Sequence, residues 1–157
     1  MTSAEKTRAQ KARELAEARA FGFLATLSER IPGYPFGSVM PYATDHQGRP
    51  LFLISTLAVH TNNLIASPKA SLLVYEVEAE TEPLSAARMN LMGEVRPVPE
   101  EDVAEARRRY LVRHPESQAY MDFADFSLYR MEIADVYYIG GFGEMGWVSH
   151  HEYSAAA

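Results

Sequence analysis

Short apolar runs separated by Gly, Pro, Asn and Asp begin at Phe21 and recur along most of the chain. Runs of this kind, rich in β-branched and aromatic residues and bounded by turn residues, predict β-strands. The expected strands span residues 21–27, 37–44, 51–55, 71–78, 88–96 and 127–139. Glycines at 140, 141 and 143 break the last strand, and residues 146–148 resume it.

Two local signals indicate how the strands connect. The segment from Asp45 to Gly48 is typical of a hairpin turn between two neighbouring strands. Pro41 lies inside the expected strand 37–44, and proline has no N–H for a strand ladder. That strand is therefore expected at a sheet edge or at a bulge.

One expected helix precedes the first three strands, and another follows them. Residues 2–20 lack Gly and Pro and start with the possible capping box Thr2-x-x-Glu5. The apolar face of this helix is thin, so we expect it on the domain surface or at a partner. Its inward residues are Ala12, Leu15, Ala16 and Arg19. Residues 57–67 predict a short helix that stops at Pro68.

The clearest helix spans residues 99–114, with Pro99 in its first turn and acidic residues at its positive end. Its expected inward stripe is Val103, Arg107, Tyr110 and Leu111. Residues 149–157 are expected to be a frayed tail. About six strands, mostly linked by hairpins, with helices between them predict a mainly β fold, a small antiparallel barrel with flanking helices, formed by one domain over residues 1–157.

The composition excludes several kinds of functional site and partner. The 157 residues carry a net charge of −6 and contain no cysteine, which excludes disulfides, thiolate catalysis and iron–sulfur clusters. The acidic balance argues against nucleic acid and anionic membranes as partners. No apolar run approaches the ~18 residues of a membrane span, so we expect a cytoplasmic protein.

Some residues suggest a ligand site. Ser55 and Thr56 precede an expected helix, where free N–H groups favour a phosphate, although such hydroxyls more often cap the helix. Arg88 starts a strand and suits a phosphate or carboxylate clamp, or else a salt bridge. His60 and Asn63 share a helix face, where they are either site residues or ordinary surface residues.

Other motifs are set aside. Gly141-x-Gly143-x-x-Gly146 matches the dinucleotide fingerprint, but it lacks the strand–helix–strand unit that this motif requires. The glycines instead indicate a tight loop. The five histidines have no zinc-site spacing, so no metal is expected, and the catalytic residues stay unknown.

Taken in order, several stretches resemble the pyridoxamine 5′-phosphate oxidase-like, FMN-binding split-barrel proteins, and most of all the HugZ-related branch. The similar stretches include residues 22–26, 35–39, 48–55, 57–64, 68–74, 88–93, 109–115, 125–130 and 140–148. The resemblance implies a six-stranded split barrel that forms a homodimer, with FMN in clefts at the subunit interface.

The resemblance also implies roles for particular residues. It sets Gly37, Ser38, Val39 and Met40 beside the isoalloxazine, and Ser55 and Thr56 near the ribityl chain or phosphate. His60 falls where many of these oxidases have a phosphate-binding lysine, and Arg88 where they have a flavin-contacting glutamine. Trp147 would lie near the flavin or the dimer seam.

The expected function is an FMN-dependent oxidoreductase acting on a small flat substrate. The alternatives are a non-catalytic protein that stores, senses or shields FMN or haem, a HugZ-like haem-degrading protein, and a barrel that has lost its cofactor. A deazaflavin in place of FMN also stays open. Haem turnover ranks lower because its ligand would be His150 or His151, which lie in the expected tail.

Overall fold

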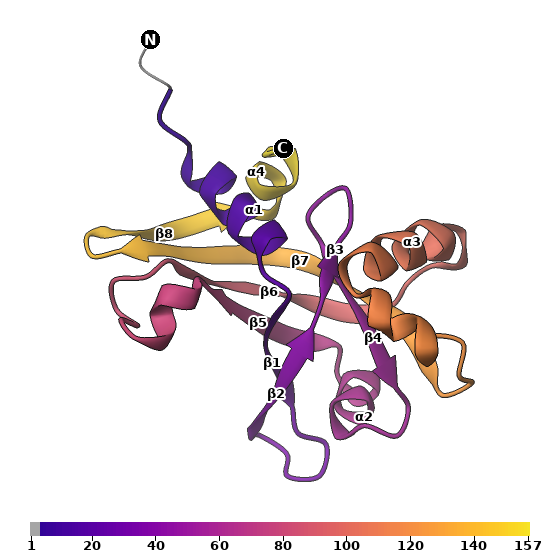
Figure 1. The fold of residues 1–157 in the computed structure, drawn as a ribbon. Coiled ribbons are helices and arrows are strands. Elements are labelled where there is room, and N and C mark those ends of the chain that lie inside the picture. The colour runs from indigo at the N-terminus through magenta and orange to yellow at the C-terminus, as the bar shows by residue number, and fades with distance from the viewer. Residues whose placement is uncertain (1–3) are drawn as a thin grey trace.

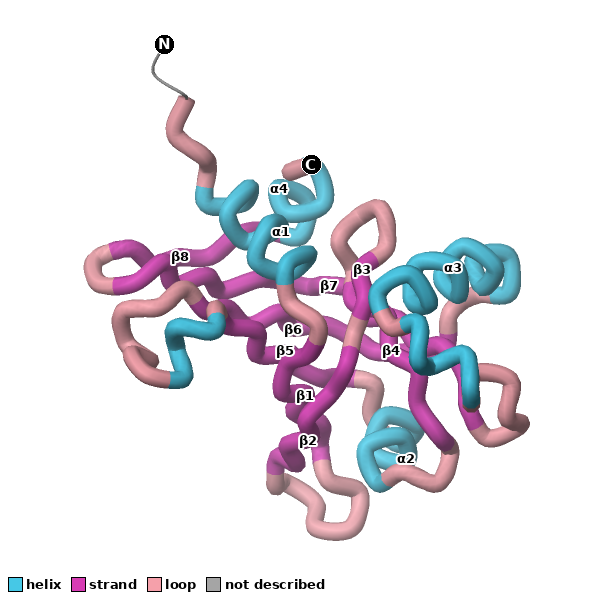
Figure 2. Tube along the Cα trace, viewed as in Figure 1, coloured by secondary structure: helices cyan, strands magenta, loops and turns pink. Residues whose placement is uncertain are grey.

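The computed structural model describes residues 4–157, which form one antiparallel sheet with four α-helices around it (Figure 1 and Figure 2). Seven strands lie in the order β2 (Pro35–Pro41), β1 (Phe21–Leu27), β5 (Lys69–Tyr75), β6 (Arg88–Pro97), β7 (Phe126–Gly141), β4 (Pro50–Ser55) and β3 (Ala43–Thr44). An eighth, β8 (Glu144–Ser149), pairs with β7. The helices are α1 (Arg8–Ala18), α2 (Val59–Ala66), α3 (Val103–Arg113) and α4 (His150–Ala155), with short 3₁₀ turns η1 (Val77–Glu80), η2 (Glu100–Asp102) and η3 (Pro115–Ala119).

The predicted mainly β class with flanking helices is confirmed, with eight strands in place of six. One extra strand arises at Pro41, where β2 leaves its partner β1 and the chain continues as β3 beside β4. As expected from Pro41, β2 is an edge strand. The second extra strand is β8. Gly141 and Gly143 make it possible, since both adopt the positive φ of the tight turn between β7 and β8.

The split in the barrel lies along one edge of β7. β6 occupies one edge of β7, while β4 pairs with residues 126–130 and β8 with residues 135–141 of the opposite edge. Residues 131–134 between them have no strand partner on that edge in the described chain. Helix α4 and the 45–48 turn lie at this gap, around a small cavity lined by Gln47, Ile133 and Tyr153 among others.

Two apolar clusters stabilise the fold. The inner cluster fills the barrel with residues such as Leu24, Leu72, Leu91 and Met131, all fully buried, and helices α1, α2 and α4 contribute to it. The second cluster lies under α3, where Tyr110 packs with Leu51, Leu53 and Leu128. Because β4 alternates Phe52 and Ile54 with Leu51 and Leu53, it serves both clusters and is buried on both faces.

A buried guanidinium joins three segments that are far apart in sequence. Arg13 of α1 is 5% exposed, and its Nη1 donates to the carbonyl oxygens of Tyr153, Ser154 and Ala156 at 3.1–3.2 Å. Its Nη2 donates to the His46 carbonyl at 2.7 Å, and its Nε donates to Glu17 at 2.8 Å. Arg13 therefore satisfies the carbonyls at the end of α4 and ties them to α1 and to the 45–48 turn.

Tyr153 completes this junction. Its hydroxyl donates to the Gly48 carbonyl at 2.6 Å, and its ring is 1% exposed. Gly48 has φ of 77°, and a Cβ there would collide with the Arg13 side chain. Glycine is thus required at position 48 by both the turn and the packing.

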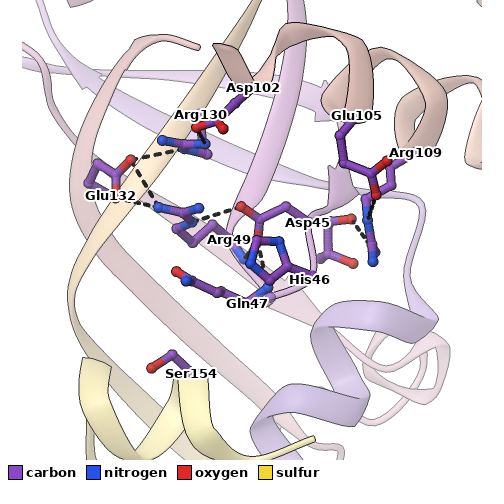
Figure 3. A network of polar contacts seen from close by, with 12 residues as sticks. Asp45, His46, Gln47, Arg49, Asp102, Glu105, Arg109, Arg130, Glu132 and Ser154 are labelled. Atoms are coloured by element: carbon purple, nitrogen blue, oxygen red, sulfur yellow. Dashed lines mark hydrogen bonds and ion pairs between the residues drawn. The ribbon is translucent and has the colours of Figure 1, made fainter. Parts of the chain in front are cut away.

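A chain of alternating charges leads from the same turn across β7. Figure 3 shows Arg49 between Asp45 and Glu132, with distances of 2.7 and 3.0 Å. Arg130, which is 7% exposed, then joins Glu132 at 2.9 Å to Asp102 at 3.0 Å. These ion pairs connect β7 to the hairpin turn on one side and to the start of α3 on the other.

The structure corrects two expectations about the ends of the chain. Helix α1 begins at Arg8 and its capping box is formed by Thr7 and Gln10, while Thr2 lies outside the described residues. The expected frayed tail 149–157 contains helix α4, capped by Ser149, because its Tyr153 is buried in the inner cluster. Among residues 4–157 no helix is long and apolar enough to cross a membrane.

The inward stripe expected for residues 99–114 is confirmed at Tyr110 and Leu111 and is wrong at Val103 and Arg107. Val103 is 38% exposed, whereas the buried residues of α3 are Ala106 and Tyr110. Arg107 is turned toward Asp122, to which it donates at 2.8 Å.

Replacing Arg13 by methionine should lower the free energy of unfolding by about 3–5 kcal/mol, because several buried acceptors lose their partner at once. The matched control is Arg108→Met, since Arg108 is largely exposed and pairs only with Glu105. We expect this control to cost less than about 1 kcal/mol. Urea unfolding of the three proteins measures both effects, and equal losses would contradict the role of Arg13.

Alkaline pH should destabilise the fold steeply. Burial raises the pKa values of Tyr42, Tyr110 and Tyr153 well above their usual value of 10.0. The folded state thus holds these three protons more tightly than the unfolded state does. The free energy of unfolding therefore keeps its full value below pH 10 and falls above it, by about 1.4 kcal/mol per tyrosine and pH unit. Urea titrations above pH 10 test this; in Tyr153→Phe the slope against pH should fall by about a third.

Candidate functional site

One row of outward-facing residues crosses six strands. The register pairs Phe23 with both Val39 and Leu73, then Leu73 with Asn90, Asn90 with Tyr137, and Tyr137 with Trp147. Side chains alternate between the faces of a strand, and the neighbours of these residues point into the barrel. The inward neighbours are Leu24, Leu72, Leu91, Val136 and Val148. The row therefore lies on the outside of the barrel.

This outward face is apolar and largely open. Val39, Phe23 and Trp147 are 66%, 38% and 58% exposed. The Phe23 ring stacks on Tyr75 at a centroid distance of 5.8 Å, and Tyr137 lies 4.9 Å from Trp147. Helices α1, α2, α3 and α4 contribute buried side chains to the two clusters instead of covering this row. A contiguous apolar patch of this kind marks a binding surface.

A hollow of about 650 Å³ lies beside this row, over β1, β5, β6 and β7. Its centre is formed by Ala25, Ser71 and Met92, which pair in register across three strands. The small side chains of Ala25 and Ser71 leave the depression. Leu27 and Ile133 extend its apolar wall, and Lys69, Glu94 and Glu132 line its polar side. The size and lining are typical of small-molecule sites.

Several residues that the sequence singles out do lie on this face. Val39 and Trp147 belong to the outward row, Gly37 pairs with Ala25 at the hollow, and Arg88 is the outward residue that pairs with Tyr75. Met40 instead is 3% exposed within the inner cluster, and Ser38 shares its direction. Alternation along β2 therefore separates the four residues 37–40 into two pairs.

The residues around α2 form a different group at the end of the barrel. The Ser55 hydroxyl donates to Asp125 at 2.6 Å and accepts from the Leu57 N–H at 3.1 Å. Helix α2 starts after Ala58, which makes no side-chain cap. The expected helix cap by Ser55 or Thr56 is therefore wrong, since two more residues separate these hydroxyls from the helix.

Asn63 is engaged within the protein, and the His60 ring is mainly neutral. Asn63 is 2% exposed; its amide donates to Thr26 Oγ1 at 3.1 Å and accepts from the Glu29 N–H at 3.0 Å. Burial lowers the pKa of His60 from its usual value, which favours the neutral ring at neutral pH. Asn63 thus anchors α2 to β1, and His60 supplies no lasting positive charge.

Arg88 makes hydrogen bonds to backbone carbonyls, and its expected role as a phosphate or carboxylate clamp stays a prediction. Its Nη1 donates to the carbonyl oxygens of Pro83 at 2.8 Å and Ala86 at 3.1 Å. No ion pair of Arg88 is present within residues 4–157. The expected salt bridge is therefore wrong; the guanidinium holds the loop between η1 and β6, beside a smaller hollow that Phe23, Tyr75 and Leu84 line.

The sequence analysis missed the centre of the hollow. Ala25, Ser71 and Met92 carry no recognisable motif, and neither do Phe23 and Tyr137 in the row beside them. The available signal was that the expected strands 21–27 and 71–78 are apolar on both faces. A strand buried on one face only should alternate with polar residues, so its second apolar face indicates a covering partner or ligand.

Two curated proteins are similar to this chain in sequence. The non-canonical heme oxygenase HOZ, chloroplastic, of Arabidopsis thaliana is 40% identical over 139 residues, which cover 86% of this chain and 42% of HOZ. Protein CREG2 of Homo sapiens is 28% identical over 165 residues, which cover 96% of this chain and 57% of CREG2. The chain spans about half the length of these curated relatives.

The solved structures lead to the same group. A heme binding protein from Mycobacterium smegmatis superposes with a TM-score of 0.90 at 31% identity, over 98% of this chain and 62% of that chain. A sequence model described as "CREG, beta-barrel" matches residues 3–155. The resemblance to the split-barrel proteins and to their HugZ-related branch is thereby confirmed. The chain belongs to the CREG β-barrel family.

Proposed function

We propose that this protein binds haem in the hollow on the outward face of its sheet. The observation that carries the proposal is the hollow itself, about 650 Å³ of mainly apolar lining with Lys69 on its polar side. A porphyrin is a flat apolar ring with carboxylates at one edge, so it suits a flat apolar floor and a nearby cation. The heme oxygenase and heme-binding names of two relatives support the same ligand.

The histidines of α4 are the candidate ligands for the haem iron. His150 lines a small cavity together with Glu132 and Ile133, and these two residues also line the hollow. Haem ranked lower on the sequence because His150 and His151 were expected in a mobile tail. Because they begin an ordered helix instead, holding them in place has no large entropic cost, and haem moves ahead of flavin.

FMN is the second candidate. β2 is an edge strand, so backbone groups of residues 37–40 are free to bind a flavin ring, as the family resemblance implies. The phosphate end fits less well, since burial lowers the pKa of His60 and disfavours a positive charge on its ring. If FMN binds, we expect redox activity on a small flat substrate. A cytoplasmic location is a separate prediction.

We also propose that two copies of the chain pair through the outward face. Val39, Phe23 and Trp147 are exposed there, and a second copy would remove this apolar surface from water. The hollow lies on the same face, so pairing would enclose a ligand between the two copies. β2 and the β8 hairpin border the face and would meet the partner.

Haemin titration tests the ligand. We expect a sharp Soret band at one haem per chain, because the cavity that His150 lines shares Glu132 and Ile133 with the hollow. Replacing both His150 and His151 by alanine should broaden and weaken the band. Filling the hollow with Ala25→Phe should lower haem affinity by roughly tenfold or more, whereas Ala104→Phe, on the exposed side of α3, should have no effect.

Flavin provides the contrasting measurement for the same proteins. Quenching of FMN fluorescence at micromolar protein, together with a broad haemin band unchanged in the double histidine variant, would reverse the ranking of the two ligands. If haem binds, supplying ascorbate then separates storage from breakdown: a stable Soret band indicates a haem-binding protein, and loss of the band indicates haem degradation.

Light scattering tests the pairing. The wild-type chain should behave as twice its 17.6 kDa mass at micromolar concentration. The double variant Val39→Arg with Trp147→Arg should be monomeric, because two exposed positions of the outward face gain a charge. Val112→Arg is the control, since Val112 is 75% exposed on α3. A wild-type monomer would contradict the proposed interface.

A further inference from the structure

A second cavity, of about 340 Å³, lies between α1 and α3, away from the outward face. Four arginines line it, namely Arg19, Arg108, Arg109 and Arg113. The remaining wall comes from Ala16 and Glu17 of α1, Ala43 and Thr44 of β3, and Val112. None of these residues lines the proposed haem hollow. In a chain with a net charge of −6, four guanidinium groups in one cleft require an explanation.

The two central arginines are held in place by backbone atoms. Arg109 and Arg113 are four residues apart on α3, so they project from the same face. Arg113 Nη2 donates to the Ala18 carbonyl at 2.7 Å, and Arg109 Nη1 donates to the Thr44 carbonyl at 3.4 Å. A guanidinium carries five N–H donors, so each side chain is positioned with donors to spare.

The carboxylates nearby do not neutralise the cleft. Glu17 pairs with Arg13 at 2.8 Å, and Glu105 is shared between Arg108 and Arg109 at 2.7 and 3.0 Å. Arg113 has no ion pair within the described part of the chain. The cleft therefore keeps an excess of positive charge.

Arg19 adds an independent sign of a missing partner. Its Nε is buried and makes no hydrogen bond, and it is the one side-chain atom of this kind among residues 4–157. Buried donors are nearly always paired in native proteins, so an orphaned one points to a group that the bare chain does not supply. Its guanidinium carbon lies 6.0 Å from the centre of the Phe21 ring and 5.8 Å from that of Tyr75, and these aromatic contacts do not supply the missing acceptor.

We propose that this cleft binds the oxyanion group of a small molecule, a phosphate or a carboxylate. Guanidinium groups bind both groups through paired N–H donors, and Arg109 and Arg113 present such donors side by side. The volume is near the lower end of ligand sites, which suits a small anion and is too small for a porphyrin. The site is independent of the proposed haem hollow.

Isothermal titration of the purified protein with pyrophosphate and with citrate tests the site and distinguishes the two sources of oxyanion. We expect one anion to bind per chain. Tighter binding of pyrophosphate indicates a phosphate ligand, and tighter binding of citrate indicates a carboxylate ligand. Arg113→Met should weaken binding by roughly tenfold or more, because charge-assisted hydrogen bonds are lost. Arg107→Met is the control on the same helix, since Arg107 pairs with Asp122 outside the cleft, and its affinity should match wild type.

If Arg113→Met fails to fold, as circular dichroism would report, Arg113→Lys decides the question. It keeps the charge but loses the paired donors, so binding should still weaken severalfold while haemin binding is unchanged. Absence of heat with both anions at millimolar concentrations overturns the proposal. Equal weakening in the Arg107 and Arg113 variants also overturns it, because it would mean a non-specific effect of surface charge.

Discussion

The hydrogen bonds of Arg13 are the interaction on which the packing at the split of the barrel depends. β4 and β8 share one edge of β7 and leave a gap at residues 131–134, which has to be filled by something other than a strand. Arg13 brings α4 and the 45–48 turn to this gap by binding carbonyls from both. A guanidinium suits this task because its donors point in several directions and carry a charge that strengthens each bond.

Closing the barrel in this way leaves the other side of the sheet free. Helices α1, α2 and α4 all contribute to the inner cluster, and α3 covers β4 and the first part of β7. The outward residues of β1, β5, β6 and β8 thus stay uncovered although many of them are aromatic or aliphatic. The apolar face is a direct consequence of where the helices are placed, and it concentrates ligand binding and pairing on one surface.

The same arrangement separates two kinds of charge recognition. On the outward face, Arg88 is held by loop carbonyls, and Lys69 is the one cation that lines the hollow. Four arginines gather instead between α1 and α3, behind the barrel wall formed by β3. An apolar, flat ligand and a small, highly charged one would therefore be bound at sites that share no residue.

The sequence by itself determined the local elements. Short apolar runs bounded by turn residues located the strands, Pro41 marked the edge strand, and the segment from Asp45 to Gly48 formed the expected hairpin turn, because these features depend on neighbouring residues. The family resemblance added the barrel class. Only the tertiary structure decided the candidate site: pairs such as Phe23 with Leu73 and Asn90 with Tyr137 join residues about fifty positions apart, and no local pattern specifies that register. The ordered C-terminal helix was equally hidden, because its six residues are too few to be stable alone and become helical only through Tyr153 and Arg13.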